Sequence, residues 1–194
     1  MSKLINALVI AAMIGAASAA QAHDKLTIML DWFVNPDHAP LVVAKNAGIF
    51  DRHELLVDLV PPADPNDPPK LVAAGKADAA ISYQPQLHVQ IAQGLPLRRI
   101  GTLVATPLNS LVVLRDGPVK TIGDLKGKTI GYSVGGFEDA LLKTMLEQYG
   151  LQLSDVKLVN VNFALSPSIF AGKVDGTIGA FRNFELNQMD IAGK

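Results

Sequence analysis

Apolar and polar positions alternate along the chain in blocks that are typical of strands and helices following one another. Residues 26–30 form a short apolar run that predicts a buried strand, residues 31–37 are polar and aromatic, and a helical pattern then ends at Gly48. Further strands are predicted at 55–60, 76–81, 97–104, 109–114, 129–132, 156–161 and 174–180, and further helices at 68–74, 83–93, 167–171 and from 182. This alternation predicts an α/β fold with largely parallel sheets.

Two helix starts carry additional signals. Asp67 is a favourable N-cap residue, and Pro68 follows it at the first helical position. The clearest helix lies between the loop at 133–136 and Gly150. Its apolar residues recur at helical spacing, which predicts one face buried in the core: Phe137, Leu141, Leu142, Met145, Leu146 and Tyr149.

A five-residue pattern occurs twice. Ala-Gly-Lys-Ala-Asp at 74–78 returns as Ala-Gly-Lys-Val-Asp at 171–175, each time at a predicted joint from a helix into a strand. Such joints are common, so a chance repeat is the alternative explanation. Read together with the matching order of elements, the pattern predicts two similarly built lobes, residues 23–105 and 106–194, with a boundary at Ala105-Thr106-Pro107.

The first residues resemble an export signal. Lys3 precedes an apolar run at 4–17, and Ala20-Gln21-Ala22 provides small residues at the positions a signal peptidase reads. We therefore expect residues 1–22 to be a signal peptide that is cleaved near Ala22, and the mature protein to be periplasmic. A buried N-terminal helix is the alternative.

Composition excludes several classes of function. The chain has no cysteine, so disulfides, thiolate nucleophiles and thiolate metal sites are excluded. Its formal net charge of −1 gives no support for a nucleic acid as partner. The histidines lack metal-ligand spacing, so neither a metal site nor a cofactor is expected.

Candidate binding residues gather after the first strand. In open α/β sheets, ligands bind outside the carboxyl ends of the strands, and residues 31–37 occupy that position. Two lobes with a cleft between them are typical of a solute-capturing protein that closes about a hinge. The expected ligand-binding residues are Trp32, Asn35, His38, Tyr83, Gln84, Ser133, Gly135, Gly136, Asn183 and Glu185.

These residue types favour a flat, neutral or weakly basic ring. Trp32 and Phe33 offer stacking faces, side-chain amides can read ring nitrogens, and Glu185 or Asp31 can accept hydrogen bonds from an amine. Acidic residues at two helix starts disfavour an anion, because their carboxylates already offset the helix dipoles: Asp37, Glu138 and Asp139. An aminopyrimidine suits this set.

Each candidate also has a structural interpretation. Trp32 could belong to the core, Asn35 could serve a turn or a helix cap, and His38 could face solvent in a first helical turn. Gly135 and Gly136 could line the site with backbone amides or merely permit close packing.

Several segments resemble a known family. These are 30–38 with Gly48-Ile49-Phe50, 74–78, Leu-Lys-Gly-Lys-Thr-Ile-Gly at 125–131, and Ile-Gly-Ala-Phe at 178–181. They resemble the periplasmic solute-binding proteins of thiamine-precursor (hydroxymethylpyrimidine) ABC importers, within the pyrimidine-precursor-synthase-like family. The resemblance implies a type II periplasmic-binding-protein fold with a hinge cleft. It also implies capture of a hydroxymethyl- or formylaminopyrimidine by a monomer that delivers it to a permease and its ATPase at the inner membrane.

Other functions remain open. A related protein could bind a different small solute, such as a sulfonate, nitrate or riboflavin. The resemblance extends to fungal pyrimidine precursor synthases, which use a lysine-bound pyridoxal phosphate, but that lysine falls at about Ser82 here, which argues against an enzyme. The effector lobe of a transcription regulator shares this architecture. Such a protein would need a DNA-binding helical module, and the predicted leader occupies its place. The resemblance also implies that the second lobe is incomplete at Lys194, without its return to the first lobe, so that apolar surface is exposed.

Overall fold

The structure is a computed structural model that describes residues 23–194. The predicted signal peptide, residues 1–22, lies outside the described residues. Among the residues described, no helix combines the length and the apolar character needed to cross a bilayer.

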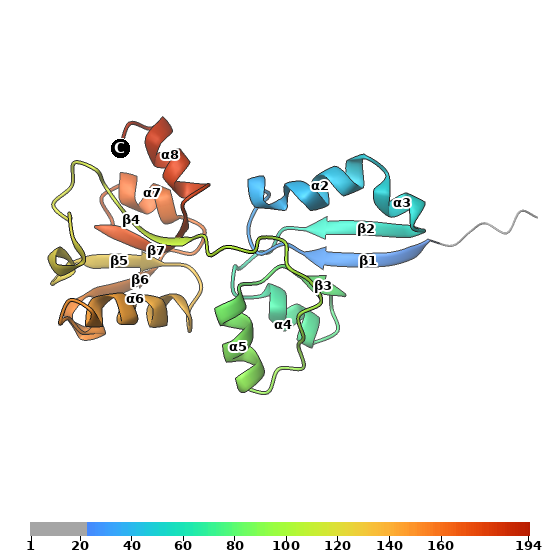
Figure 1. The fold of residues 1–194 in the computed structure, drawn as a ribbon, viewed down its shortest axis with the longest axis horizontal. Coiled ribbons are helices and arrows are strands. Elements are labelled where there is room, and N and C mark those ends of the chain that lie inside the picture. Colours follow the sequence, from blue (N-terminus) through green and yellow to red (C-terminus); the bar gives the residue numbers. More distant parts are fainter. Residues whose placement is uncertain (1–22) are drawn as a thin grey trace, which may run out of the picture.

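The first half of the chain forms a three-stranded parallel sheet in the order β2-β1-β3. Its strands are β1 (Asp24–Met29), β2 (Leu55–Val60) and the short β3 (Ala79–Ala80). Helices lie on both faces of this sheet (Figure 1): α2 (Ala39–Asn46), α3 (Ile49–Arg52), α4 (Pro68–Ala73) and α5 (Gln84–Ala92). We call the elements from β1 to α5 the first lobe.

The second half forms a four-stranded sheet in the order β4-β7-β5-β6, in which β4 runs antiparallel to β7 and the other pairs are parallel. The strands are β4 (Asn109–Val113), β5 (Thr129–Tyr132), β6 (Lys157–Asn160) and β7 (Gly176–Phe181). Helix α6 (Glu138–Glu147) covers one face, and α7 (Leu165–Phe170) and α8 (Glu185–Ile191) cover the other (Figure 1). We call the elements from β4 to α8 the second lobe. The predicted α/β architecture with largely parallel sheets is confirmed.

The repeated pentapeptide makes the same joint in both lobes. The Asp78 carboxylate accepts a hydrogen bond from the Thr27 backbone N–H at 2.7 Å, and Asp175 accepts one from the Thr129 N–H at 2.8 Å. In each case the aspartate closes the turn after a helix onto the neighbouring strand, β1 or β5. The repeat is therefore one structural unit used twice, and the boundary at residue 105 falls in the segment that joins the two units.

The second lobe contains two apolar clusters. One lies between its sheet and α6 and includes Leu142 and Leu146, which are fully buried. The other lies under α7 and α8, and Trp32 of the first lobe packs into it. Trp32 is only 6 % exposed. The indole therefore links the two lobes, because it packs into the core of the second lobe.

Three expectations about local structure are wrong. Residues 97–104 form no strand: no strand among the described residues pairs with them, and most of their side chains are exposed. Tyr149 is 57 % exposed because α6 ends at Glu147, before the helical face reaches it. Asp67 stands at the N-cap of α4 but makes no side-chain cap bond; its carboxylate pairs with Lys70 at 3.6 Å instead.

Candidate functional site

A small pocket lies between the lobes, where strand ends from both sheets meet. Asp31 and Trp32 follow β1, Tyr83 follows β3, and Phe181 ends β7. Because the carboxyl ends of parallel strands meet at one edge of a sheet, the chain brings these residues together from distant positions. We call this space the inner pocket; it is lined by Asp31, Trp32, Asn35, Tyr83, Glu138, Leu165, Gly179, Phe181, Phe184 and Glu185.

Aromatic rings form much of its wall. The Tyr83 ring contacts Phe137 at a centroid distance of 5.3 Å and meets Phe181 edge to face at 5.9 Å. Trp32 meets Phe163 edge to face at 4.8 Å. The indole Nε1–H of Trp32 is buried and has no hydrogen-bond partner. A flat ligand would therefore find apolar faces together with a free donor.

Glu138 brings a carboxyl group into this apolar surrounding. It is 3 % exposed, and its Oε2 accepts hydrogen bonds from the backbone N–H groups of Ser133 at 2.8 Å and Val134 at 3.1 Å. Burial raises the pKa of Glu138 to about 8, although these two hydrogen bonds act in the opposite direction. The amides that could have bound an anion at the start of α6 are therefore used by the protein's own carboxyl group.

Further carboxyl groups surround the pocket. Burial raises the pKa of Glu185, and the negative charges of Asp37 and Asp31 raise it further, to a smaller extent. Burial also raises the pKa of Tyr83 well above its ordinary value, and the negative charges of Asp31, Glu138 and Glu185 add to the effect. No lysine or arginine lines the inner pocket. The pocket therefore offers acceptors and negative charge to whatever occupies it.

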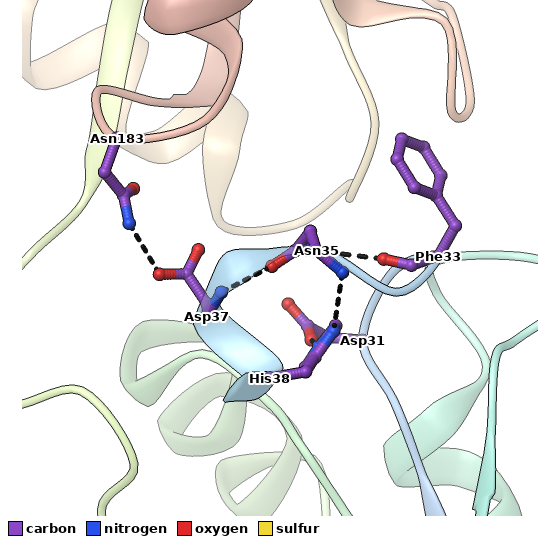
Figure 2. A network of polar contacts seen from close by, with 6 residues as sticks. All are labelled: Asp31, Phe33, Asn35, Asp37, His38 and Asn183. Atoms are coloured by element: carbon purple, nitrogen blue, oxygen red, sulfur yellow. Dashed lines mark hydrogen bonds and ion pairs between the residues drawn. The ribbon is translucent and has the colours of Figure 1, made fainter. Parts of the chain in front are cut away.

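Asp31 is held by a local network that Figure 2 shows. The His38 Nε2 lies 2.7 Å from Asp31 Oδ1, and the backbone N–H of Asn35 donates to His38 Nδ1 at 3.2 Å. Because Nδ1 accepts, the assigned tautomer carries its hydrogen on Nε2 and donates it to the carboxylate. Asn35 also caps the 3-10 helix η1 (Pro36–His38), its side chain accepting from the Asp37 N–H at 2.9 Å.

Hydrogen bonds cross between the lobes on both sides of the pocket. The Asn183 side-chain amide donates to Asp37 Oδ1 at 2.6 Å (Figure 2). Asn66, in the loop after β2, donates to the Ser133 carbonyl at 3.2 Å and accepts from the Gly135 N–H at 3.2 Å. These contacts, together with Trp32, hold the lobes closed against each other.

The predicted site residues fall into two groups. Trp32, Asn35, Tyr83 and Glu185 line the inner pocket. The others do not line it: His38, Gln84, Ser133, Gly135, Gly136 and Asn183.

The second group has other roles. His38 is 1 % exposed, so it does not face solvent, and its imidazole contacts Asp31, which lines the pocket. Gln84 is exposed, and the Ser133 hydroxyl donates to the Asn162 carbonyl. Gly135 and Asn183 make hydrogen bonds between the two lobes, and neither residue lines the inner pocket.

Some pocket residues were not singled out from the sequence. Glu138 was assigned only a dipole role, yet its side chain turns back into the pocket from the first turn of α6. Gly179 makes this possible: a Cβ there would lie 2.2 Å from Glu138 Oε1. A glycine inside the strand pattern at 174–180 was the one available signal for such a close approach.

We expect Gly179→Ala to destabilise the protein by more than about 2 kcal/mol, because a positive φ costs a residue with a Cβ roughly 1–2 kcal/mol and the methyl group also displaces Glu138. The φ of Gly179 is +93°. Gly172→Ala is the matched control, since Gly172 has a φ of +64° and open space around it. Urea unfolding measures both. Equal losses in the two variants would contradict the role assigned to the close contact.

The raised pKa of Glu138 predicts a pH dependence of stability. The folded state holds the proton up to a pH of about 8, whereas an ordinary glutamate releases it near 4.5. Protonated Glu138 therefore stabilises the folded state fully below pH 4.5, the pKa of this group in the unfolded chain. This stabilisation is lost as the pH rises from 4.5 to about 8. We expect a loss on the order of a few kcal/mol, since one pKa unit corresponds to about 1.4 kcal/mol.

Glu138→Gln stays neutral at every pH and keeps an acceptor for the two backbone N–H groups. Its unfolding free energy should therefore change less between pH 5 and pH 8 than that of the wild type, as measured in urea. The same pH dependence in both proteins would show that Glu138 does not titrate with folding.

The inner pocket has little free space. Its free volume is about 10 Å³, which is room for roughly one water molecule. A six-membered ring therefore needs the walls of the pocket to move before it fits. In the described residues, no group of histidine and carboxylate side chains is arranged to hold a metal ion.

Three proteins of similar sequence have names that refer to thiamine biosynthesis or to a pyrimidine. A Haemophilus influenzae protein named for thiamine biosynthesis is 60% identical over 170 residues, which cover 88% of this chain and 54% of that protein. The formylaminopyrimidine-binding protein of Halalkalibacterium halodurans is 36% identical over 87% of this chain and 51% of its own length. The 4-amino-5-hydroxymethyl-2-methylpyrimidine phosphate synthase of Schizosaccharomyces pombe is 30% identical over 80% of this chain and 45% of its own length. The chain thus spans about half the length of these relatives.

Solved structures identify the fold. The periplasmic aliphatic sulphonate binding protein SsuA of Escherichia coli superposes with a TM-score of 0.61 at 21% identity, over 80% of this chain and 53% of that structure. The predicted periplasmic-binding-protein fold is confirmed. The sequence profile described as NMT1/THI5 like matches residues 35–194. The chain therefore belongs to the NMT1/THI5-like family.

Proposed function

We propose that this chain is the ligand-capturing part of a periplasmic binding protein that takes an aminopyrimidine related to thiamine into the inner pocket. The protein delivers it to an ABC permease and its ATPase. The single observation that carries the proposal is the set of polar groups in the pocket: buried carboxyl groups converge among aromatic rings, and neither lysine nor arginine lines it.

This set of groups selects the ligand class. A sulfonate or nitrate ion would be placed against Asp31, Glu138 and Glu185 without a compensating cation, and burying an unpaired charge costs several kcal/mol. An aminopyrimidine instead donates from its exocyclic amine to a carboxylate and accepts on a ring nitrogen from a protonated carboxyl group such as Glu138, so it can pair with carboxyl groups in either protonation state. Its flat ring matches the faces of Trp32 and Tyr83.

The comparisons support this choice of ligand. The Halalkalibacterium halodurans relative is named a formylaminopyrimidine-binding protein. The sulfonate-binding proteins share the fold at 21% identity, and fold alone does not determine the ligand. The leader at 1–22 supports export to the periplasm.

Calorimetric titration tests the proposal with 4-amino-5-hydroxymethyl-2-methylpyrimidine, its formylamino analogue, taurine, nitrate and riboflavin. We expect saturable binding of the pyrimidines and no binding of the sulfonate taurine or of nitrate. Tighter binding of taurine, nitrate or riboflavin than of both pyrimidines would overturn the assignment.

Relatives named as pyrimidine phosphate synthases make an enzyme the second candidate. The sequence resemblance implies a lysine-bound pyridoxal phosphate for that reaction, and the residues present do not fit this cofactor. Ser82 stands at about the position of the lysine, and its hydroxyl lies 3.0 Å from the Gln86 side-chain oxygen. The carboxyl groups around the pocket would also repel a phosphate. We therefore propose a binding protein rather than an enzyme.

A further inference from the structure

A second, larger space opens directly beside the inner pocket. We call it the outer groove; its walls are the rings of Phe33, Phe163 and Phe170, and Leu165, Ser166, Pro167, Glu185 and Gln188 complete it. Its free volume is about 380 Å³, within the range of roughly 300–1,000 Å³ that is typical of small-molecule sites. Leu165 and Glu185 line both spaces, so the two adjoin each other.

One buried polar group points to a ligand in this groove. Ser166 is 3 % exposed, and its hydroxyl has no hydrogen-bond partner. A buried hydroxyl without a partner costs free energy that a ligand atom can recover. The residues that line the groove therefore combine apolar side chains with a serine whose buried hydroxyl is unpaired, which is the usual composition of a small-molecule site.

The groove favours a flat ring that is cationic rather than anionic. Phe33 and Phe170 are each 42 % exposed, so their rings are accessible from the groove, and phenylalanine faces attract cations. Glu185 contributes a carboxyl group where the groove meets the inner pocket, and no lysine or arginine lines the groove. An anionic substituent would meet only this carboxyl group and apolar rings.

We propose that the outer groove is a subsite for a second ring of the ligand, a heteroaromatic cation joined to the aminopyrimidine by a short linker. The inference rests on the proposed function, because it places the aminopyrimidine in the inner pocket. It goes beyond that function by making the preferred ligand a two-ring molecule. Thiamine has this chemistry, since one methylene group joins its aminopyrimidine to a positively charged thiazolium ring.

Calorimetry with two probes tests the subsite. Thiamine and 4-amino-5-hydroxymethyl-2-methylpyrimidine share the pyrimidine ring and differ in the second ring. We expect thiamine to bind at least about tenfold more tightly, the scale of a cation held against aromatic faces with partial loss of water. Phe170→Ala and Ser166→Ala should each reduce this ratio several-fold while leaving the affinity for the one-ring pyrimidine unchanged.

Tyr149→Ala is the matched control, because it removes an exposed ring of the second lobe that lines neither space. It should leave both affinities unchanged, and thermal unfolding verifies that each variant is folded. Equal affinity for the two probes in the wild type, or an equal loss for both probes in Phe170→Ala, would overturn the subsite while the proposed function stands. Binding of neither probe would overturn the proposed function as well.

Discussion

Replacing Trp32 by alanine is expected to weaken pyrimidine binding by at least about tenfold and to lower stability by roughly 3–5 kcal/mol. The first loss follows because aromatic stacking adds about 0.5–1.5 kcal/mol to the burial of ring surface. The second follows because Trp32 is 6 % exposed and packs into the core beneath α7 and α8, and removal of a buried indole leaves a cavity. Calorimetry measures the affinity and urea unfolding the stability.

Trp32→Phe separates the two effects. A phenyl ring keeps a stacking face but lacks the indole N–H, which is buried without a partner in the pocket wall. We expect this variant to retain most of the stability and to lose affinity by less than the alanine variant. Undiminished pyrimidine binding in Trp32→Ala would show that the indole only fills the core, which was the alternative left open by the sequence.

Glu185→Gln should reduce pyrimidine affinity by about 10- to 100-fold, because a hydrogen bond to a charged group contributes roughly 1.5–3 kcal/mol. The substitution is nearly isosteric. It retains an acceptor for the backbone N–H of Phe181, which now donates to Glu185 Oε2 at 2.7 Å. The loss should therefore appear in ligand binding, measured by calorimetry, with little change in unfolding.

Glu147→Gln is the control for this variant. Glu147 lies on the exposed side of α6, where it pairs with Lys143 at 2.9 Å and lines neither space. We expect it to leave the affinity unchanged. If Glu185→Gln bound the pyrimidine as tightly as the wild type, the carboxyl group would have no part in recognising the amine.

The fold could be predicted because local signals agreed with the tertiary structure. The apolar runs became strands wherever a neighbouring strand could pair with them, and the helix before Gly150 buried Leu142 and Leu146 as its spacing required. The strand predicted at 97–104 had a suitable composition, but a strand also needs a partner, which lies outside the information in a short window. The cap at Asp67 failed because Asp67 has a helical backbone conformation (φ −89°, ψ −32°), whereas a capping side chain needs an extended one.

Only part of the site could be predicted in the same way. Residues at the ends of strands, such as Trp32 and Tyr83, were found because topology alone places them at the cleft. Side-chain direction was not predictable. His38 turns inward to Asp31, and Glu138 reaches into the pocket only because Gly179 leaves room for it. Such side-chain directions depend on tertiary packing, which periodicity along the chain does not describe.

Fluorescence of Trp32 gives the most direct test of the central claim, that a flat amine-bearing ring rather than an anion occupies the inner pocket. Trp32 is the chain's single tryptophan and lies in the wall of that pocket, so its emission reports on the site itself. Titration with 4-amino-5-hydroxymethyl-2-methylpyrimidine should produce a saturable change in emission, and the anion methanesulfonate should produce none. A saturable change with methanesulfonate, and none with the pyrimidine, would contradict the account.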